Sequence, residues 1–323
     1  MNVVIIGGGT GQSRVLKALK NDVGNLSAIV TMADDGGSTG RLRKYQNAPA
    51  VGDLRQCLVA LAEPGRLWSK IFPYRFGNDR WGKNAKDIEG HVIGNILLVA
   101  LVDVLGGLPP AVASAAREMG VKSTHGIYPS TFENVVLEAE LNNGQSVVGQ
   151  YNISHTLPRA KKFRIKKLTL KTVPPKGGPI TGNPEAVSKI NQADVVIIGP
   201  GALHGSVLPN LLIPEITKAI QACKAKKIYI SNTAIKLAET HGFTLQDHVR
   251  AIIKHTSADI FDLILVNNKI LKHQKAVSML TTKMKEIEGI PVRQADLVDD
   301  HDIFNHDPRK LREQLLTIFG RKL

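Results

Sequence analysis

Five short apolar runs, rich in valine and isoleucine, recur along this chain, and each ends in small or polar residues. They occupy residues 3–9, 28–35, 195–201, 228–233 and 263–268. Apolar runs without polar alternation are typical of strands buried on both faces of a parallel sheet. Helical patterns fill the intervals, at residues 12–20, 52–62, 91–105, 111–119, 185–192, 209–223, 245–254 and 308–319. This order predicts an α/β fold with a doubly wound, mostly parallel Rossmann-like sheet.

One interval breaks the order of strand and helix. Residues 134–154 alternate apolar and polar side chains around Asn142, Asn143 and Gly144, which predicts a β-hairpin. With the basic segment that follows it, this hairpin gives a small expected β insertion at about 127–175. No low-complexity linker or internal repeat divides the chain, so we expect residues 1–323 to form a single α/β domain.

The composition predicts a soluble cytoplasmic protein. Cys57 and Cys223 lie far apart and match no metal or redox spacing, which fits a reducing compartment. The start, MNVVIIGGG, has no basic leader and is typical of a first strand rather than a signal peptide. The most apolar stretch begins at His91, contains Asn95 and Asp103, and is too short to span a bilayer. We therefore expect no membrane association.

The net charge of +14 is unevenly distributed, because residues 159–178 hold eight Lys or Arg and no acid. Within this segment, residues 159–176 could bind nucleic acid or another polyanion. Alternatively they form the solvated face of an edge strand, since Phe163 and Ile165 alternate with basic residues. No aromatic-rich motif accompanies the segment, so we favour the edge strand over a nucleic-acid partner.

A glycine loop, GGGTGQS, joins the first predicted strand to the first predicted helix. Glycines let the backbone approach a phosphate, and a helix N-terminus offers free N–H groups. The phosphate-binding candidates are Gly8, Gly9, Thr10 and Gly11. The dinucleotide fingerprint fits only in part because Gln12 replaces its last glycine, and the phosphate-loop lysine is absent. A tight turn without a ligand is the alternative.

The second predicted strand ends in ADDGGSTGRLR, residues 33–43. Here two carboxylates, Asp34 and Asp35, precede a glycine-rich turn with Arg41 and Arg43. A divalent cation explains this pairing, because it binds carboxylate oxygens on one side and phosphate oxygens on the other. We therefore expect Asp34 and Asp35 to hold a metal such as Mg²⁺. An Asp-Gly turn with solvated arginines is the alternative.

Further candidates follow along the chain. Gly37 and Ser38 lie in the turn just described, and Arg55 and Asn95 lie on later helices. Asp53 is either a helix N-cap or a third carboxylate beside the paired acids. His91, four residues before Asn95 on one helical face, is either a ligand-binding residue or a cap.

The later strand ends supply Gly199, Gly201, Asn232 and Thr233. The segment 299–308 resembles a metal site, but a capping loop before a helix explains it better. No nucleophile elbow, Ser-His-Asp order or zinc motif is present, and nothing indicates a flavin or a haem. The residues together indicate a nucleotide or sugar-diphosphate site with a metal and without a covalent nucleophile.

The order of these motifs resembles that of the YvcK/CofD-like family. The matching stretches are IGGGTG, VTMADDGGSTGRLR, GDLRQCLVAL, GHVIGNILL, IGPGALHGSVLPNLL and NTAIKLAETHGFTLQDHV. One branch of the family contains the gluconeogenesis factors and the other the 2-phospho-L-lactate transferases. The Gly-Gly-Ser after the paired acids resembles the first branch more closely. The chain departs from the family pattern at Gln12, Ala202, His204, Gly205, Asn305, His306 and Asp307.

The resemblance implies a cytoplasmic protein that binds a UDP-sugar, such as UDP-GlcNAc or UDP-glucose. Such a protein supports cell-wall growth and cell shape on gluconeogenic carbon sources, and we expect it to form a homodimer. Because the glycine loops are accompanied by no catalytic nucleophile, we expect it to bind the sugar without turnover. The alternative is a metal-dependent transferase that moves a phospholactyl-type group from a nucleotide diphosphate. In that case Asp34, Asp35 and Asp53 match the acids near which the transferase branch holds its metal and acceptor.

Overall fold

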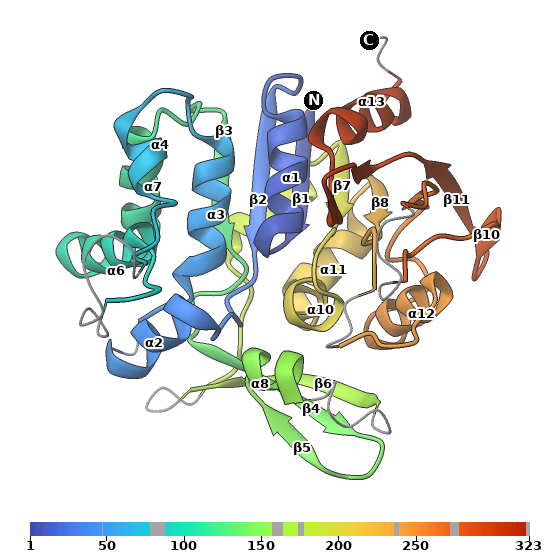
Figure 1. Ribbon diagram of the computed structural model, residues 1–323, viewed down its shortest axis with the longest axis horizontal. Coiled ribbons are helices and arrows are strands. Elements are labelled where there is room, and N and C mark those ends of the chain that lie inside the picture. The colour runs from blue at the N-terminus through green and yellow to red at the C-terminus, as the bar shows by residue number, and fades with distance from the viewer. Residues whose placement is uncertain are drawn as a thin grey trace.

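An eight-stranded sheet forms the centre of the computed structural model, which describes residues 1–46, 48–77, 88–156, 164–173, 178–235, 239–271 and 278–320 (Figure 1). Its strands are β1 Asn2–Gly7, β2 Asn25–Val30, β3 His125–Pro129, β7 Val195–Ile198, β8 Lys226–Ile230, β9 Leu263–Asn267, β10 Glu286–Ile287 and β11 Ile290–Ala295. They lie in the order β10-β11-β9-β8-β7-β1-β2-β3, and every neighbouring pair except β10–β11 is parallel. The predicted fold class is confirmed.

The five predicted apolar runs overlap β1, β2, β7, β8 and β9, which are five of the six interior strands of the sheet. All four residues of β7 are buried, and so are five of the six in β1. The edge strand β3 escaped prediction because it alternates between buried and partly exposed residues. In β11, which lies beside the short edge strand β10, only the first and last residues are buried, so it forms no continuous apolar run.

The main helices are α1 Gly9–Leu19, α2 Gly37–Gln46, α3 Val51–Leu61, α4 Leu67–Ile71, α6 Ile93–Leu105, α7 Leu108–Glu118, α8 Gln150–Thr156, α9 Pro184–Asn191, α10 Leu208–Leu211, α11 Pro214–Ala222, α12 Leu245–His255 and α13 Pro308–Ile318. A short π-helix, η2 Leu203–Val207, precedes α10. α1 packs between α3 and α13, as Figure 1 shows. The predicted helix 209–223 is divided, because Pro214 begins a new helix. Among the described residues, no helix is both long and apolar enough to cross a membrane.

A second, antiparallel sheet lies beyond the edge at which the strands of the large sheet end (Figure 1). Its strands are β4 Val135–Leu141, β5 Ser146–Val148 and β6 Ile165–Thr172, in the order β5-β4-β6. β4 and β5 form the predicted hairpin, but residues 150–154 at the end of the predicted stretch belong to the helix α8. β3, at 125–129, pairs with β2 and so belongs to the large sheet.

Both halves of the large sheet hold this small sheet in place. Arg43, on α2, donates to the Val135 carbonyl of β4 at 2.6 Å. From the other half, Lys254 of α12 donates to the Lys166 carbonyl at 2.7 Å. The small sheet therefore connects two parts of the chain that lie on opposite sides of the strand ends.

The basic residues 159–176 are described only over 164–173, and the others in this range lie outside the described residues. Its described part is β6, which has β4 as its neighbour on one side. Lys166 pairs with Glu140 and Lys171 with Glu138, each at 2.7 Å, so acids on the neighbouring strand offset part of its charge.

The chain ends with a hairpin and a helix. β12 Val298–Asp299 pairs with β13 Asp302–His306, and α13 follows directly. Asp307 is the N-cap of α13, since its side chain accepts from the N–H groups of Arg309 and Lys310. The expected capping role of this segment is confirmed for Asp307.

Candidate functional site

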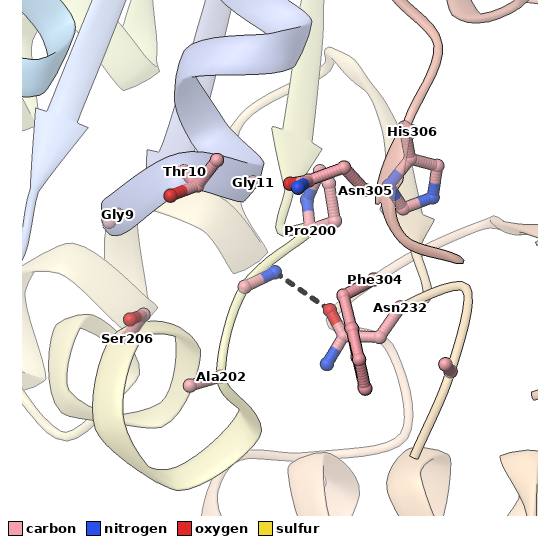
Figure 2. Close-up of a pocket in the computed structure, with 13 residues that line it drawn as sticks. Gly9, Thr10, Gly11, Pro200, Ala202, Ser206, Asn232, Phe304, Asn305 and His306 are labelled. Atoms are coloured by element: carbon pink, nitrogen blue, oxygen red, sulfur yellow. Dashed lines mark hydrogen bonds between the residues drawn. The ribbon is translucent and has the colours of Figure 1, made fainter. Parts of the chain in front are cut away.

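The carboxyl ends of β1, β2, β7 and β8 open into a cleft with two adjoining chambers. We call the first the amide chamber; its lining residues are Gly8, Gly9, Thr10, Gly11, Pro200, Gly201, Ala202, Ser206, Asn232, Ala234, Phe304, Asn305 and His306 (Figure 2). We call the second the acid chamber; its lining residues are Gly9, Thr10, Asp34, Asp53, Gln56, Gln150, Ser154, Ala202, Gly205, Ser206 and Glu239. The two chambers adjoin each other, because four residues line both: Gly9, Thr10, Ala202 and Ser206.

The N-terminus of α1 lies where the two chambers meet. β1 ends at Gly7 and α1 begins at Gly9, and the N-cap residue, Gly8, has no side chain with which to cap the helix. First-turn N–H groups and the positive end of the dipole are the features by which a helix N-terminus binds an anion. All four predicted phosphate-loop residues, Gly8 to Gly11, line the amide chamber.

Two of these glycines are required by close packing. A Cβ at Gly11 would overlap the backbone carbonyl of Pro200, in the loop after β7. A Cβ at Gly8 would overlap the carboxylate of Asp53. The absence of side chains at these two positions brings three separate loops together.

Gln12, the departure from the dinucleotide fingerprint, has a structural role. Its side chain is fully buried and donates to the carbonyls of Ile5 and Ile29, each at 2.9 Å. Its oxygen accepts from the Cys57 thiol at 3.4 Å. Gln12 thus links β1, β2 and α3 beneath the cleft.

The two consecutive acids after β2 have different roles. Asp34 lines the acid chamber and accepts from the Gly36 N–H at 3.0 Å, and burial raises the pKa of its carboxyl group. Asp35 accepts from the N–H groups of Gln150 and Tyr151 at 3.1 and 2.7 Å, and so caps α8 of the small sheet. Both oxygens of Asp35 are engaged by backbone amides.

Asp53 lies in the first turn of α3 and lines the acid chamber with Asp34. The alternative reading of Asp53 as an N-cap is wrong, because the N-cap of α3 is Ala50. Among the described residues, no group of three His, Cys, Asp or Glu side chains is arranged to hold a metal ion.

The stretch after the paired acids was expected to be a turn, but most of it forms the helix α2, which begins at Gly37. Gly37 has a φ of +47°, a conformation that favours glycine. The Ser38 hydroxyl lies 3.1 Å from His91 Nδ1 and accepts from the Val92 N–H at 3.2 Å. Arg41 donates to the Glu89 carbonyl at 2.6 Å. These contacts join α2 to the segment before α6.

Several predicted residues consequently lie outside both chambers: Gly37, Ser38, Arg41, Arg55, His91 and Asn95. Burial, reinforced by the charge of Arg41, lowers the pKa of His91. Arg55 donates to Asn95 Oδ1 at 3.0 Å, and its burial lowers the pKa of the guanidinium. These residues connect α2, α3 and α6 behind the cleft.

The later loops are fixed by side chain to backbone contacts. The Gly201 N–H donates to Asn232 Oδ1 at 3.1 Å, shown as a dashed line in Figure 2. Gly199, with a φ of +76°, forms the turn before Pro200. Thr233 donates to the Ile303 carbonyl at 2.6 Å, so it holds β13 in place and does not line the cleft.

The C-terminal hairpin supplies a wall of the amide chamber that was not predicted. Figure 2 shows Phe304, Asn305 and His306 opposite the start of α1. Burial lowers the pKa of His306 to about 4, which keeps its ring neutral near pH 7. Its Nε2 is buried and has no hydrogen-bond partner among the described residues.

The acid chamber also contains residues that were not predicted, above all Glu239, Gln150 and Ser154. Glu239 accepts from the His204 N–H at 3.0 Å, and its side chain is 3% exposed. Gln150 and Ser154 come from α8, one turn apart, and hydrogen bond to each other at 2.9 Å. The helix α8, which connects β5 to β6 of the small sheet, therefore contributes directly to the cleft.

The chain that forms this cleft also matches a known protein family. The family model described as "2-phospho-L-lactate transferase CofD" matches residues 3–298. The chain belongs to the CofD family.

Members of the family with similar sequences include a "Gluconeogenesis factor" of Halalkalibacterium halodurans, 35% identical over 98% of this chain and 95% of its own length. The "Gluconeogenesis factor" of Bacillus subtilis is 34% identical over 98% of this chain and 97% of its own length. A crystal structure of a Bacillus halodurans protein superposes with a TM-score of 0.86 at 34% identity, over 98% of this chain and 99% of that one. The fold and the family resemblance are thus established over nearly the whole chain.

Proposed function

We propose that this member of the CofD family is a cytoplasmic regulatory protein that binds a UDP-sugar without turning it over. It would act as a gluconeogenesis factor, needed for cell shape and cell-wall growth on gluconeogenic carbon sources. The names of its full-length relatives support the general role. The observation that carries the ligand class is the glycine-rich N-terminus of α1, which lines both chambers.

The two chambers suit the two ends of such a ligand. A diphosphate bound by the first-turn N–H groups of α1 would lie between them. Asn232, Asn305 and His306 offer neutral hydrogen-bonding groups to a nucleoside on one side. Glu239, Gln150 and Ser154 offer hydrogen-bonding groups to sugar hydroxyls on the other.

Magnesium fits this arrangement as an accompanying ion. Mg²⁺ is commonly bound by one or two carboxylates together with the phosphates of a ligand, rather than by a cage of protein groups. Asp34 and Asp53 would hold it, since Asp35 is engaged by α8. Its contribution would be to neutralise the diphosphate beside these acids.

Calorimetry with UDP-GlcNAc and UDP-glucose in the presence of Mg²⁺ tests the proposal. Ala202 lines both chambers, so Ala202→Leu should obstruct the cleft and abolish the heat of binding, whereas Ala202→Ser should retain it. No heat from the wild-type protein at millimolar concentrations of either sugar nucleotide would refute the proposal.

A second candidate is the metal-dependent transfer of a phospholactyl-type group from a nucleotide diphosphate. Its supporting observation is that Asp34 and Asp53 line one chamber in a protein of the CofD family. In that case Asp53→Asn should abolish product formation while the melting temperature stays near that of the wild type. Unchanged turnover in this variant would exclude a catalytic role for Asp53.

A further inference from the structure

The amide chamber suits an uncharged, planar group such as a nucleobase. Among its described lining residues there is no lysine, arginine or carboxylate. Phe304 is exposed, and it is the only Phe, Tyr or Trp among the described residues that line either chamber. Nucleobases stack on such rings. The base of a nucleotide whose diphosphate lies at α1 is therefore better placed here than in the acid chamber.

A second observation indicates that this chamber takes a ligand. The His306 side chain lines it and is 2% exposed, and its Nε2 has no hydrogen-bond partner among the described residues. Buried polar atoms in folded proteins almost always have a partner. A group that enters the chamber beside Phe304 and Asn305 would complete this wall.

One side-chain amide of this chamber, that of Asn232, has a fixed orientation. The Gly201 N–H can only donate, so the Asn232 atom that lies 3.1 Å from it must be the oxygen, as Figure 2 shows. This contact leaves the amide nitrogen, Nδ2, to donate to a group in the chamber. Asn232 therefore presents a donor to a ligand, while its oxygen faces the loop after β7.

We propose that Asn232 is a specificity-determining residue that selects uracil over cytosine in the sugar nucleotide. This inference rests on the proposed binding of a UDP-sugar. Uracil carries an acceptor, O4, at the position where cytosine carries the N4 amino group, a donor. Nδ2 of Asn232 can hydrogen bond to O4, whereas it would meet a second donor in N4. Gly201 prevents the amide from turning over to offer its oxygen instead, because its N–H would then face a second donor.

The test compares UDP-glucose with CDP-glucose, which carry the same sugar, diphosphate and charge and differ only in the base. Both are titrated into the wild-type protein by calorimetry with Mg²⁺ present. We expect CDP-glucose to bind on the order of tenfold more weakly, because two donors then face each other without an acceptor. Binding of CDP-glucose within about threefold of UDP-glucose, or more tightly, overturns the inference. Failure of both ligands to bind refutes the proposed function instead, so the two failures are distinguishable.

Asn232→Asp keeps an oxygen for the Gly201 N–H and replaces the donor with an acceptor, so the preference should reverse in favour of CDP-glucose. Repulsion between the new carboxylate and the diphosphate affects both ligands equally and cancels in the ratio of their dissociation constants. Asn268→Asp, the same substitution at an exposed residue outside both chambers, is the matched control and should retain the wild-type ratio. Asn232→Ser adds no charge and lacks the fixed amide donor, so its two dissociation constants should become nearly equal. A wild-type ratio in folded Asn232→Asp or Asn232→Ser protein overturns the assignment to Asn232.

Discussion

Burial lowers the pKa of two histidines, His248 and His306, to about 4. In an unfolded chain a histidine titrates near pH 6.5. Below that pH the unfolded state therefore binds protons that the folded state excludes, and stability falls as the pH decreases. The contribution of each neutral, buried histidine to the free energy of unfolding is fully present above about pH 6.5 and is lost as the pH falls towards 4.

Each of these histidines should lower the free energy of unfolding by about 2 kcal/mol between pH 7.5 and pH 5. His248→Gln cannot titrate, so its stability should fall less over this range by about that amount. Urea unfolding at both pH values measures the effect, and the exposed His301→Gln serves as the control. If wild type and His248→Gln lose the same stability, His248 does not exclude protons from the folded state.

Gly11 gives a second prediction for a single residue. In Gly11→Ala the new methyl group would overlap the Pro200 carbonyl and push the loop after β7 away from α1. Alanine favours a helix, but overpacking costs about 1–3 kcal/mol, so we expect net destabilisation and loss of UDP-sugar binding. Gly178→Ala, with open space around the added Cβ, is the control. Unfolding curves and calorimetry that match the wild type for Gly11→Ala would contradict the close packing of these loops.

At the scale of elements, the helix α8 depends on one side chain from a distant loop. Asp35 accepts from two of its first N–H groups, and this places Gln150 and Ser154 in the acid chamber. Asp35→Ala should cost about 1 kcal/mol, increase hydrogen exchange over 150–156 and weaken UDP-sugar binding. Thr244→Ala, which removes the cap of α12, should cost a similar amount without affecting α8. Unchanged protection of α8 in Asp35→Ala would show that Asp35 does not position it.

Whether an element depends on contacts from distant segments explains which elements could be predicted from the sequence. The interior strands β1, β2, β7, β8 and β9 were predicted because burial on both faces requires continuous apolar runs. The helix α2 has two glycines and little apolar periodicity, and contacts such as Ser38 with Val92 hold it. The helix α8 begins where Asp35 caps it. Such contacts between distant segments leave no periodic signal in the sequence.

At the scale of the whole molecule, the cleft was predictable where it follows directly from the sheet. Gly9, Gly201 and Asn232 come just after buried parallel strands, whose carboxyl ends meet at one edge. Glu239, Gln150 and His306 were missed because their positions depend on how the loop, the small sheet and the hairpin pack. Closeness in sequence to a predicted binding loop also did not place a residue in the cleft. Arg41 and His91 follow such loops, but their side chains contact Glu89 and Ser38 instead.

Three parts of the chain build the acid chamber, and this leads to a prediction for the whole protein. Asp34 and Asp53 come from the first half, Gln150 from the helix α8 between β5 and β6, and Ser206 and Glu239 from the second half. A ligand that contacts all of them should reduce hydrogen exchange in all three at once. At 100 times its Kd it should add about 2.7 kcal/mol to the free energy of unfolding.

Hydrogen exchange and thermal unfolding with saturating UDP-glucose and Mg²⁺ measure both effects, and Ala202→Leu provides the control with an obstructed cleft. Protection limited to the loop after β1 would mean that the ligand binds α1 without entering the acid chamber. Protection that includes α8 and the loop around Glu239 requires the small sheet to act as a wall of the cleft. The Lys254 and Arg43 contacts that hold this sheet would then contribute to binding without touching the ligand.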